Sequence, residues 1–470
     1  MSATATTEKK YLKWYQKLAY GSGDLASNCS YGLVSSFVLL YLTGTLGLDS
    51  AIIGSLMLAS KVLDGISDVI FGTLIDRTHS KLGKARPWML FGQVGVSLCL
   101  FLLFAIPAGS TTMQYIYFFI VYTALNAVFY TANGIAYSSL VALITKNNNE
   151  RVQLGSFRFM FAVVTNIFMG FAVTGMVEKF GSGAAGWRTT ALIFAIVGLV
   201  VNTISCLAVK ELPEEELSGN TSEAAEEGKA VAEEKKHGFA ETAKILVHNK
   251  YYLMILAIYI VYYIMSNLTT GAGVFCATYY WGDGSLLGQF SMMKMLPVII
   301  ALAFAPVLIK KTGSMQKVNF WGYAISSVLG IPMIYFDMQK NLSMFLLFMF
   351  IKGVFAGTLS GSLNALIAEA SGYTTRTTGV HMDGMMYSCS SLGVKVGGGI
   401  GTAAVGWLLK LGGFVGTATV QSESAIRMIF NLYITFPFVI GIIITVLLAF
   451  LDVEKANKKW DAEHQKEAQA

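Results

Sequence analysis

The chain has 470 residues, of which 54% are apolar and 13% aromatic, whereas only 13% are charged. Soluble globular proteins contain about 25% charged residues and rarely carry repeated apolar stretches of about 20 residues, so this composition excludes an ordinary soluble protein. The formal net charge of +6 comes without a basic patch interleaved with aromatic residues, which argues against nucleic acid as a partner.

Apolar windows of about 20 residues predict twelve membrane-spanning helices. In chain order they cover 18–43, 51–75, 88–107, 113–143, 155–177, 188–209, 251–280, 288–309, 318–336, 342–368, 380–411 and 427–451. A polar stretch rich in Glu, Ala and Lys separates the sixth span from the seventh, and such a stretch cannot lie in hydrocarbon. We therefore predict an all-α polytopic membrane protein whose parts are a six-helix half (1–211), a cytoplasmic loop (212–250), a second six-helix half (251–455) and a cytoplasmic tail (456–470).

The distribution of Lys and Arg over the loops predicts the orientation. The loops after the second, fourth and eighth spans are basic, whereas the intervening loops TGTLGLDS, PAGSTT and YWGDGSLLG contain neither Lys nor Arg. Because basic loops face the cytoplasm, both termini and the central loop are expected on the cytoplasmic side of the cell membrane. The polar start of the chain has no clear cleavage site, so we expect a cytoplasmic start and not a removable signal peptide.

Several classes of function lack their sequence signals. The five cysteines are scattered singly, the five histidines are dispersed, and no C-x-x-C pair occurs, so no transition-metal site or disulfide framework is expected. The sequence contains no G-x-S-x-G elbow, no phosphate-binding loop and no repeated selectivity filter. We expect neither an enzyme nor a channel, and no cofactor.

The second span carries three charges, in the segment KVLDGISDVIFG (61–72). Lys61, Asp64 and Asp68 are spaced by three and four residues, so they share one helix face. A charge at the centre of a membrane helix costs about 2.5–3.5 kcal/mol. One interpretation is an ion-pair set that only fixes helix packing. The functional alternatives are an oxygen-lined cation site, as Na⁺ prefers, or a carboxylate pair that shares a proton.

Other spans also carry polar residues. Asp24 and Asn28 lie one turn apart in the first span, and Lys395 precedes a stripe of glycines in the eleventh. We expect that stripe to pack closely on a neighbouring helix, and the Lys395 ammonium to approach the Asp64/Asp68 face. Lys294, near the start of the eighth span, is expected to reach the outer interface, the alternative being contact with an anionic substrate.

The loop after the second span resembles the signature of the major facilitator superfamily between its second and third helices. The match is carried by Gly72, Asp76, Arg77, Gly83, Lys84 and Arg86. A weaker echo, IKKTGSMQK, follows the eighth span. This resemblance implies two like six-helix halves around a binding site near the membrane midplane.

Four further segments resemble the glycoside–pentoside–hexuronide:cation symporter family, in its melibiose-permease-like form. They are YGSGDLASN, LASKVLDGISD, ITKNNNERVQLGSFRFMF and GVHMDGMMYSCSSLGVKVGGGIG. They occur in the family's order and cover both halves. The resemblance implies uptake of a sugar together with a cation by alternating access.

The resemblance also assigns residues by position. It places the cation at Asp64 and Asp68, with Ser67 and Thr131 on further positions of that site. It places the substrate near Lys61, Asn28, Asp24, Arg158, Lys395 and Asn133, although Asp24 has a packing or hinge role as an equal alternative. Lys395 would also couple the two sites.

Some positions depart from the galactoside-transporting pattern. Asn28 and Gly134 stand where those members have Asp, Asn133 lies just before the second of these positions, and Ser138 replaces the aromatic residue that stacks on the sugar. We therefore expect a monomeric symporter in the membrane of a bacterial cell that takes up a glycoside, pentoside or small oligosaccharide with Na⁺ or H⁺. The alternative is a proton-coupled exporter or a carrier of an anionic non-sugar on the same fold.

Overall fold

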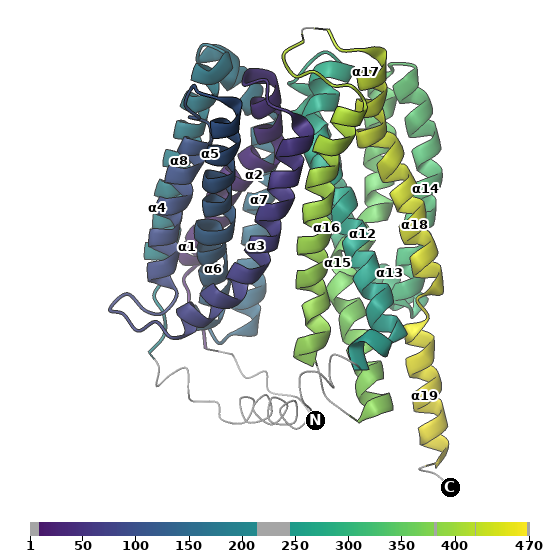
Figure 1. The fold of residues 1–470 in the computed structure, drawn as a ribbon. Helices are drawn as coiled ribbons and strands as arrows, with labels where there is room; N and C mark the ends of the chain where they lie inside the picture. The colour runs from purple at the N-terminus through teal and green to yellow at the C-terminus, as the bar shows by residue number, and fades with distance from the viewer. Residues whose placement is uncertain (1–8, 214–244, 380–382, 419, 468–470) are drawn as a thin grey trace. The chain divides into compact units, whose positions relative to one another are not determined.

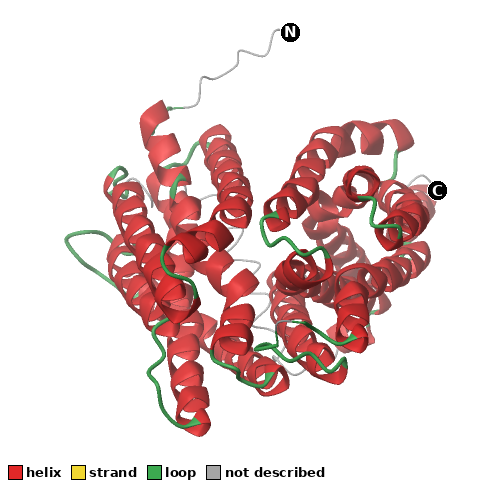
Figure 2. Ribbon diagram, turned by 90° about the horizontal axis from the view of Figure 1, so that it is seen from above, coloured by secondary structure: helices red, strands yellow, loops and turns green. Residues whose placement is uncertain are grey.

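The computed structural model of the protein describes residues 9–213, 245–379, 383–418 and 420–467. Every regular element in these ranges is a helix, and Figure 2 shows helices joined by loops. The prediction of an all-α protein is confirmed.

The N-terminal helices follow the predicted spans closely. They are α1 (Trp14–Gly21), α2 (Gly23–Leu40), the π-helical turn η1 (Tyr41–Thr45), α3 (Ser50–Asp76), α4 (Arg86–Leu103), α5 (Thr111–Thr123), the π-helical turn η2 (Ala124–Tyr130), α6 (Thr131–Ile144), α7 (Asn148–Lys179) and α8 (Gly183–Leu207). Since α1, α2 and η1 form one segment and α5, η2 and α6 another, these elements make six long helical segments.

The C-terminal part repeats this layout. Its elements are α12 (Lys250–Phe275), the π-helical turn η3 (Cys276–Tyr280), α13 (Leu286–Thr312), α14 (Met315–Met338), α15 (Leu342–Thr378), α16 (Asp383–Leu411), α17 (Glu423–Phe430), the π-helical turn η4 (Asn431–Thr435), α18 (Phe436–Phe450) and α19 (Val453–Glu467). The first segment of each part ends in a π-helical turn, η1 or η3. Residues 456–467 of the predicted tail belong to α19, which begins soon after α18 ends.

The long helices have the dimensions and surfaces of membrane spans. Ten of those in the described residues are long and apolar enough to cross a membrane. The other two, α3 and α14, have 27 and 24 residues. At 1.5 Å per residue they extend about 40 and 36 Å, more than the hydrocarbon core. Large apolar side chains such as Val69, Phe91 and Phe450 are exposed, as suits contact with lipid. The twelve-helix prediction is confirmed.

The chain divides into two compact units (Figure 1). The N-terminal unit contains Met1–Gly219 with the short segments Asp283–Gly288 and Leu409–Ser422, and the C-terminal unit contains the remainder. The predicted central loop falls mostly on residues 214–244, which lie outside the described residues. The predicted boundaries at 211, 250 and 455, like the predicted orientation, stay predictions.

Glycines bring the first helices of the N-terminal unit against their neighbours. A Cβ atom on Gly21 would lie 2.6 Å from the Phe157 side chain, and one on Gly23 would lie 2.8 Å from the Tyr137 ring. The buried carbonyl group of Tyr20 accepts hydrogen bonds from Tyr137 Oη (2.8 Å) and Ser205 Oγ (2.9 Å). The YGSG segment therefore lets α1 and α2 pack closely on the helices that carry Phe157 and Tyr137.

One carboxylate in each unit caps the start of a distant helix. Glu211, after α8, accepts the backbone N–H groups of Lys84 (2.7 Å), Ala85 (3.0 Å) and Arg86 (3.1 Å) at the start of α4. Glu454, after α18, accepts the N–H groups of Met315 (2.8 Å) and Gln316 and the Ser314 hydroxyl at the start of α14. A carboxylate satisfies otherwise unpaired N–H groups and the positive end of the helix dipole. The repeated device supports two like halves.

The cap on α4 predicts that Gly83 is essential for stability. Its φ is +110°, and a Cβ atom there would lie 2.3 Å from the Glu211 carboxyl carbon. Alanine must adopt a strained backbone and displace the carboxylate, which costs about 3 kcal/mol in total. The G83A variant, purified in detergent, should lose thermal stability by several degrees.

A second glycine supplies the control. Gly181 has φ +103°, but nothing lies within 4 Å of the position of its Cβ atom. The G181A variant therefore carries the backbone strain without the displaced carboxylate, and it should lose clearly less stability. Equal losses in the two variants would show that the Glu211 cap does not matter.

Candidate cation and substrate sites

The charged face predicted for α3 is present. Asp64 is 8% exposed, and its Oδ2 lies 3.5 Å from the ammonium nitrogen of Lys61. Asp68 follows one turn later on the same helix and is half-buried. The Lys61 ammonium also lies 6.0 Å from the centroid of the Tyr31 ring, at the outer limit of a cation–π contact. The structure thus brings two carboxylates and one ammonium together within the N-terminal unit.

A hydroxyl group from another helix completes this cluster. Thr131 Oγ1 lies 2.6 Å from Asp64 Oδ1 and 2.9 Å from the Asn126 carbonyl oxygen. The second contact spans five residues, because Thr131 directly follows the π-helical turn η2. Such turns are frequent at functional sites. The hydroxyl has one proton and two acceptors, so it can turn from the carboxylate to the carbonyl group.

Ser67 lies on the same helix but is differently engaged. Its hydroxyl donates to the backbone carbonyl of Asp64 at 2.9 Å. This bond uses the proton and leaves the oxygen lone pairs available for a cation. The assignment of Ser67, like those of Asp64, Asp68 and Thr131, remains a prediction about binding.

An ion pair holds α2 to α7 in the same unit. Arg158 Nε lies 2.6 Å from Asp24 Oδ2, and the guanidinium carbon lies 4.2 Å from the centroid of the Tyr137 ring. The pair is only partly exposed, with 25% and 18% of the two side chains accessible. Asp24 is therefore engaged by Arg158 in this structure, in agreement with either of its predicted roles.

The segment ITKNNNER, which leads into α7, is held by contacts of Glu150 and Arg151. The buried Glu150 carboxylate accepts the Thr145 hydroxyl (2.7 Å) and the N–H groups of Tyr11 (3.1 Å) and Leu12 (3.2 Å), and pairs with Lys17 (3.0 Å). Arg151 Nε donates to the Thr145 carbonyl group at 3.1 Å. These contacts fix the start of the helix that carries Arg158.

Asn28 has a partner that sequence reasoning missed. Its Oδ1 accepts from Asn166 Nδ2 at 2.9 Å, and its own Nδ2 donates to the Asp24 carbonyl group at 2.7 Å. Asn166 lies two turns beyond Arg158 on α7. Two carboxamides and the ion pair thus form a row of polar groups along α2 and α7.

Asn133 lies elsewhere. It is 3% exposed, and its amide donates to the Met89 carbonyl group (2.9 Å) and lies near Gln93 Oε1 (3.3 Å) and Asn202 Oδ1 (3.5 Å). These contacts join α4, α6 and α8 inside the unit. They make Asn133 a packing residue of the unit, and its predicted part in the substrate site stays a prediction.

The superfamily loop signature covers the end of α3, the loop that follows and the start of α4. Asp76 and Arg77 are exposed at the end of α3, Gly72 has open space beside it, and Arg86 Nε donates to the Cys206 carbonyl group at 3.2 Å. Together with the Glu211 cap on Lys84, Ala85 and Arg86, which follow Gly83, these contacts explain how the loop is held. A role in gating stays a prediction.

In the C-terminal unit, the glycine stripe of α16 packs on α12. Cβ atoms on Gly393, Gly397 and Gly401 would lie 2.4, 2.4 and 2.6 Å from atoms of Tyr259, Ile260 and Ile264 respectively. The expected close packing of these glycines is confirmed. Lys395 is half-buried on this helix, two residues from Gly393 and Gly397.

Comparison with known proteins identifies the family. The model of the family described as MFS/sugar transport protein matches residues 19–455. The chain belongs to this family. As a member of the MFS sugar-transport family, it is a membrane transporter of the glycoside–pentoside–hexuronide type, and the resemblance inferred from its motifs is confirmed.

Several relatives are similar to this chain over almost its whole length. The isoprimeverose transporter of Lactiplantibacillus pentosus is 26% identical over 98% of this chain and 93% of its own. The putative glycoside/cation symporter YagG of Escherichia coli (strain K12) is 24% identical over 94% and 92%. A solved structure of a bacterial homologue of the human lysosomal transporter Spinster superposes with a TM-score of 0.68 at 13% identity, covering 95% of this chain and 98% of that one. This likeness shows the major facilitator fold.

Proposed function

We propose that the chain takes up a glycoside, pentoside or small oligosaccharide together with one monovalent cation, Na⁺ or H⁺. The observation that carries this proposal is the buried cluster on α3, in which Asp64 lies between Lys61 and Thr131, with Asp68 one turn away. The names of the isoprimeverose transporter and the glycoside/cation symporter among its relatives support the same substrate class.

The charges of the cluster favour a monovalent partner. Asp64 and Asp68 place two carboxylates one turn apart, and the Lys61 ammonium lies beside the first of them. Two carboxylates at close range inside a membrane helix bundle repel each other, so one bound Na⁺ or proton would stabilise the pair. Carboxylate and hydroxyl oxygens are ligands of the type that Na⁺ takes.

The contacts of Asp64 suggest how binding would occur. Both of its oxygens are engaged, one by the Lys61 ammonium and the other by the Thr131 hydroxyl. An entering cation replaces the ammonium as the partner of the carboxylate. The Thr131 hydroxyl then donates its proton to the Asn126 carbonyl group, and a lone pair of the hydroxyl oxygen faces the cation. Because the Lys61 ammonium is displaced, cation binding changes the position of a positive charge near the substrate.

The polar row along α2 and α7 is the proposed part of the sugar site in this unit. Asn28, Asn166 and the Asp24–Arg158 pair offer donors and acceptors to sugar hydroxyl groups. Lys61 and Lys395 are further residues that the family resemblance assigns to substrate binding. Rocking of the two halves would expose the site alternately to each side of the membrane.

Transport by the purified chain in proteoliposomes tests the proposal. Counterflow of a panel of labelled glycosides and pentosides is measured with Na⁺ present or replaced by K⁺, at two values of pH. We expect at least one sugar to exchange, and its uptake to become uphill when an inward gradient of Na⁺ or H⁺ is imposed. Exchange that is indifferent to both gradients would contradict cation coupling.

A further inference from the structure

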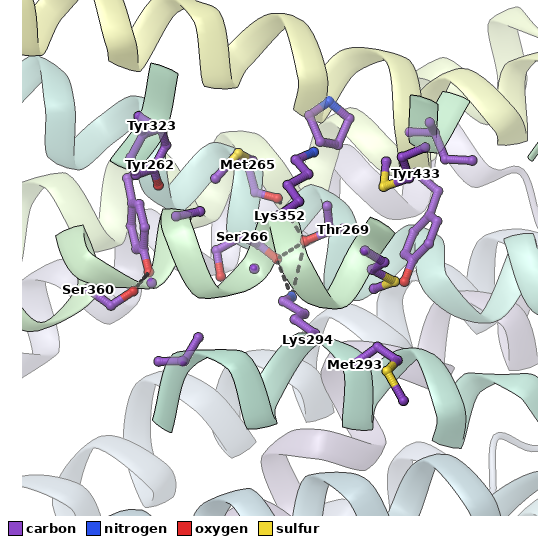
Figure 3. A pocket seen from close by; sticks show the side chains of 18 of the residues that line it. Tyr262, Met265, Ser266, Thr269, Met293, Lys294, Tyr323, Lys352, Ser360 and Tyr433 are labelled. Atoms are coloured by element: carbon purple, nitrogen blue, oxygen red, sulfur yellow. Dashed lines mark hydrogen bonds between the residues drawn. The ribbon is translucent and has the colours of Figure 1, made fainter. Parts of the chain in front are cut away.

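A cavity of about 180 Å³ lies within the C-terminal unit, among α12, α13, α14, α15 and η4. Its wall is mostly apolar, and methionines such as Met265 and Met293 contribute to it (Figure 3). Two basic side chains are also part of the wall, Lys294 from α13 and Lys352 from α15. An apolar cavity with a few polar groups is the usual form of a small-molecule site.

Both lysines lie well inside their helices. Lys294 is eight residues beyond Leu286 and Lys352 is ten residues beyond Leu342, so they stand about 12 and 15 Å along α13 and α15 from the same end of the unit. The expectation that Lys294 reaches the outer interface is wrong. Its ammonium instead turns to α12, where it donates to the hydroxyl groups of Thr270 (3.0 Å) and Thr269 (3.1 Å), and the Ser266 carbonyl group lies at 3.5 Å.

The described residues offer these ammonium groups no negative partner. None of the described residues that line the cavity is Asp or Glu. Lys294 has neutral oxygens as its partners, and for Lys352 no hydrogen bond or ion pair is found in the part of the chain that the structure describes. Two like charges that face one cavity inside a membrane protein are costly unless an anion binds between them.

We propose that Lys294 and Lys352 form a subsite for an anionic group, a carboxylate or a sulfonate, on the molecule that the chain transports. Hydroxyl groups in the cavity wall suit the rest of a sugar acid, since Tyr262 Oη and Ser360 Oγ lie 2.7 Å apart there. This inference rests on the proposed function and narrows its substrate to acidic sugars.

Matched pairs of substrates test the subsite. Each pair has the same ring and aglycone and differs only at C6, as in 4-nitrophenyl β-D-glucuronide and 4-nitrophenyl β-D-glucoside, with the corresponding galactose pair beside it. Binding is measured by thermal stabilisation of the purified chain, and transport is measured in proteoliposomes. We expect the acid of at least one pair to be preferred by about tenfold or more, because each hydrogen bond between charged partners contributes strongly.

Variants then assign the preference to the lysines. K294M and K352M should each reduce it by about tenfold, whereas K352R, which keeps the charge, should largely retain it. K310M is the control, because Lys310 is an exposed residue at the other end of α13.

The outcomes separate this inference from the proposed function. Transport of neutral sugars without an acid preference, or a preference that survives in both methionine variants, would overturn the anion subsite and leave sugar transport intact. If neither acidic nor neutral sugars were carried, the proposed function would fail, and the inference that rests on it would fail too.

Discussion

The D64N variant is expected to lose uphill accumulation of sugar and to keep exchange of internal for external sugar. Asparagine has nearly the same shape as aspartate and can still accept a hydrogen bond from Thr131, which lies 2.6 Å from Asp64 in the native chain. It cannot neutralise a cation. Uphill transport requires that cation and sugar affect each other's binding, and without the cation site this coupling is absent.

Two measurements in proteoliposomes distinguish coupling from general damage. In D64N, an imposed Na⁺ or H⁺ gradient should bring internal sugar only to the external concentration, whereas counterflow should proceed. The D68N variant should behave in the same way. E178Q is the matched control, because Glu178 is an exposed carboxylate on α7, and it should accumulate sugar normally.

The native lysine supplies a further readout. In D64N the Lys61 ammonium loses the carboxylate that lies 3.5 Å away, so the purified variant should be less stable in detergent. Its stability should no longer rise with added Na⁺ if Na⁺ is the coupling ion. If D64N and D68N both accumulated sugar at the native level, these carboxylates would be packing residues only.

Much of the fold was predictable because lipid imposes a simple rule on the sequence. A backbone in hydrocarbon must satisfy its own hydrogen bonds, and apolar windows of about 20 residues do so as helices. The windows locate the spans, although α7 begins seven residues before its predicted span and α15 ends ten residues after its own. The shared face of Lys61, Asp64 and Asp68 followed from helical spacing alone. Thr131, by contrast, came only from the family resemblance, since no pattern in the chain links residues 64 and 131.

The contacts that hold the sites together were not predictable from one sequence. Glu211 caps Arg86 across 125 residues, and Asn166 reaches Asn28 across 138. Local spacing carries no signal for such pairs. The π-helical turn before Thr131 also has no sequence signature, because its residues would suit an ordinary helix.

Lys294 shows how a correct general rule gave a wrong expectation. Lysines near helix ends usually extend to the interface, but Thr269 and Thr270 on α12 offer hydroxyl oxygens at 3.1 and 3.0 Å. The sequence does not reveal that α12 lies beside this part of α13. Lys352 was not singled out, because an isolated lysine has no pattern to mark it.

The glycine stripe indicates the face of α16 from which Lys395 projects. Gly393, Gly397 and Gly401 recur every four residues and turn one face of α16 toward α12. Lys395 lies two residues from Gly393 and from Gly397, which is about 200° around the helix. It therefore projects from a different face of α16 than the one that the glycines turn toward α12.

Removing the Lys395 ammonium is the second change for which we expect a large effect. We predict that the Lys395 ammonium approaches the Asp64/Asp68 face during transport and links the sugar site to the cation site. The K395A variant should insert and fold, since the glycine face of α16 is untouched, but both accumulation and counterflow of sugar should fall to background. K310A, which removes an exposed ammonium from α13, should leave both unchanged.

A double variant tests the electrostatic basis of this link. Without the Lys395 ammonium, less positive charge would face the carboxylates of Asp64 and Asp68. Their mutual repulsion should then oppose closure of the site. K395A/D68N removes one charge of each sign, so it should recover counterflow while accumulation stays absent. If K395A alone accumulated sugar with its normal cation dependence, Lys395 would have no part in the mechanism, and coupling would reside within α3 and Thr131.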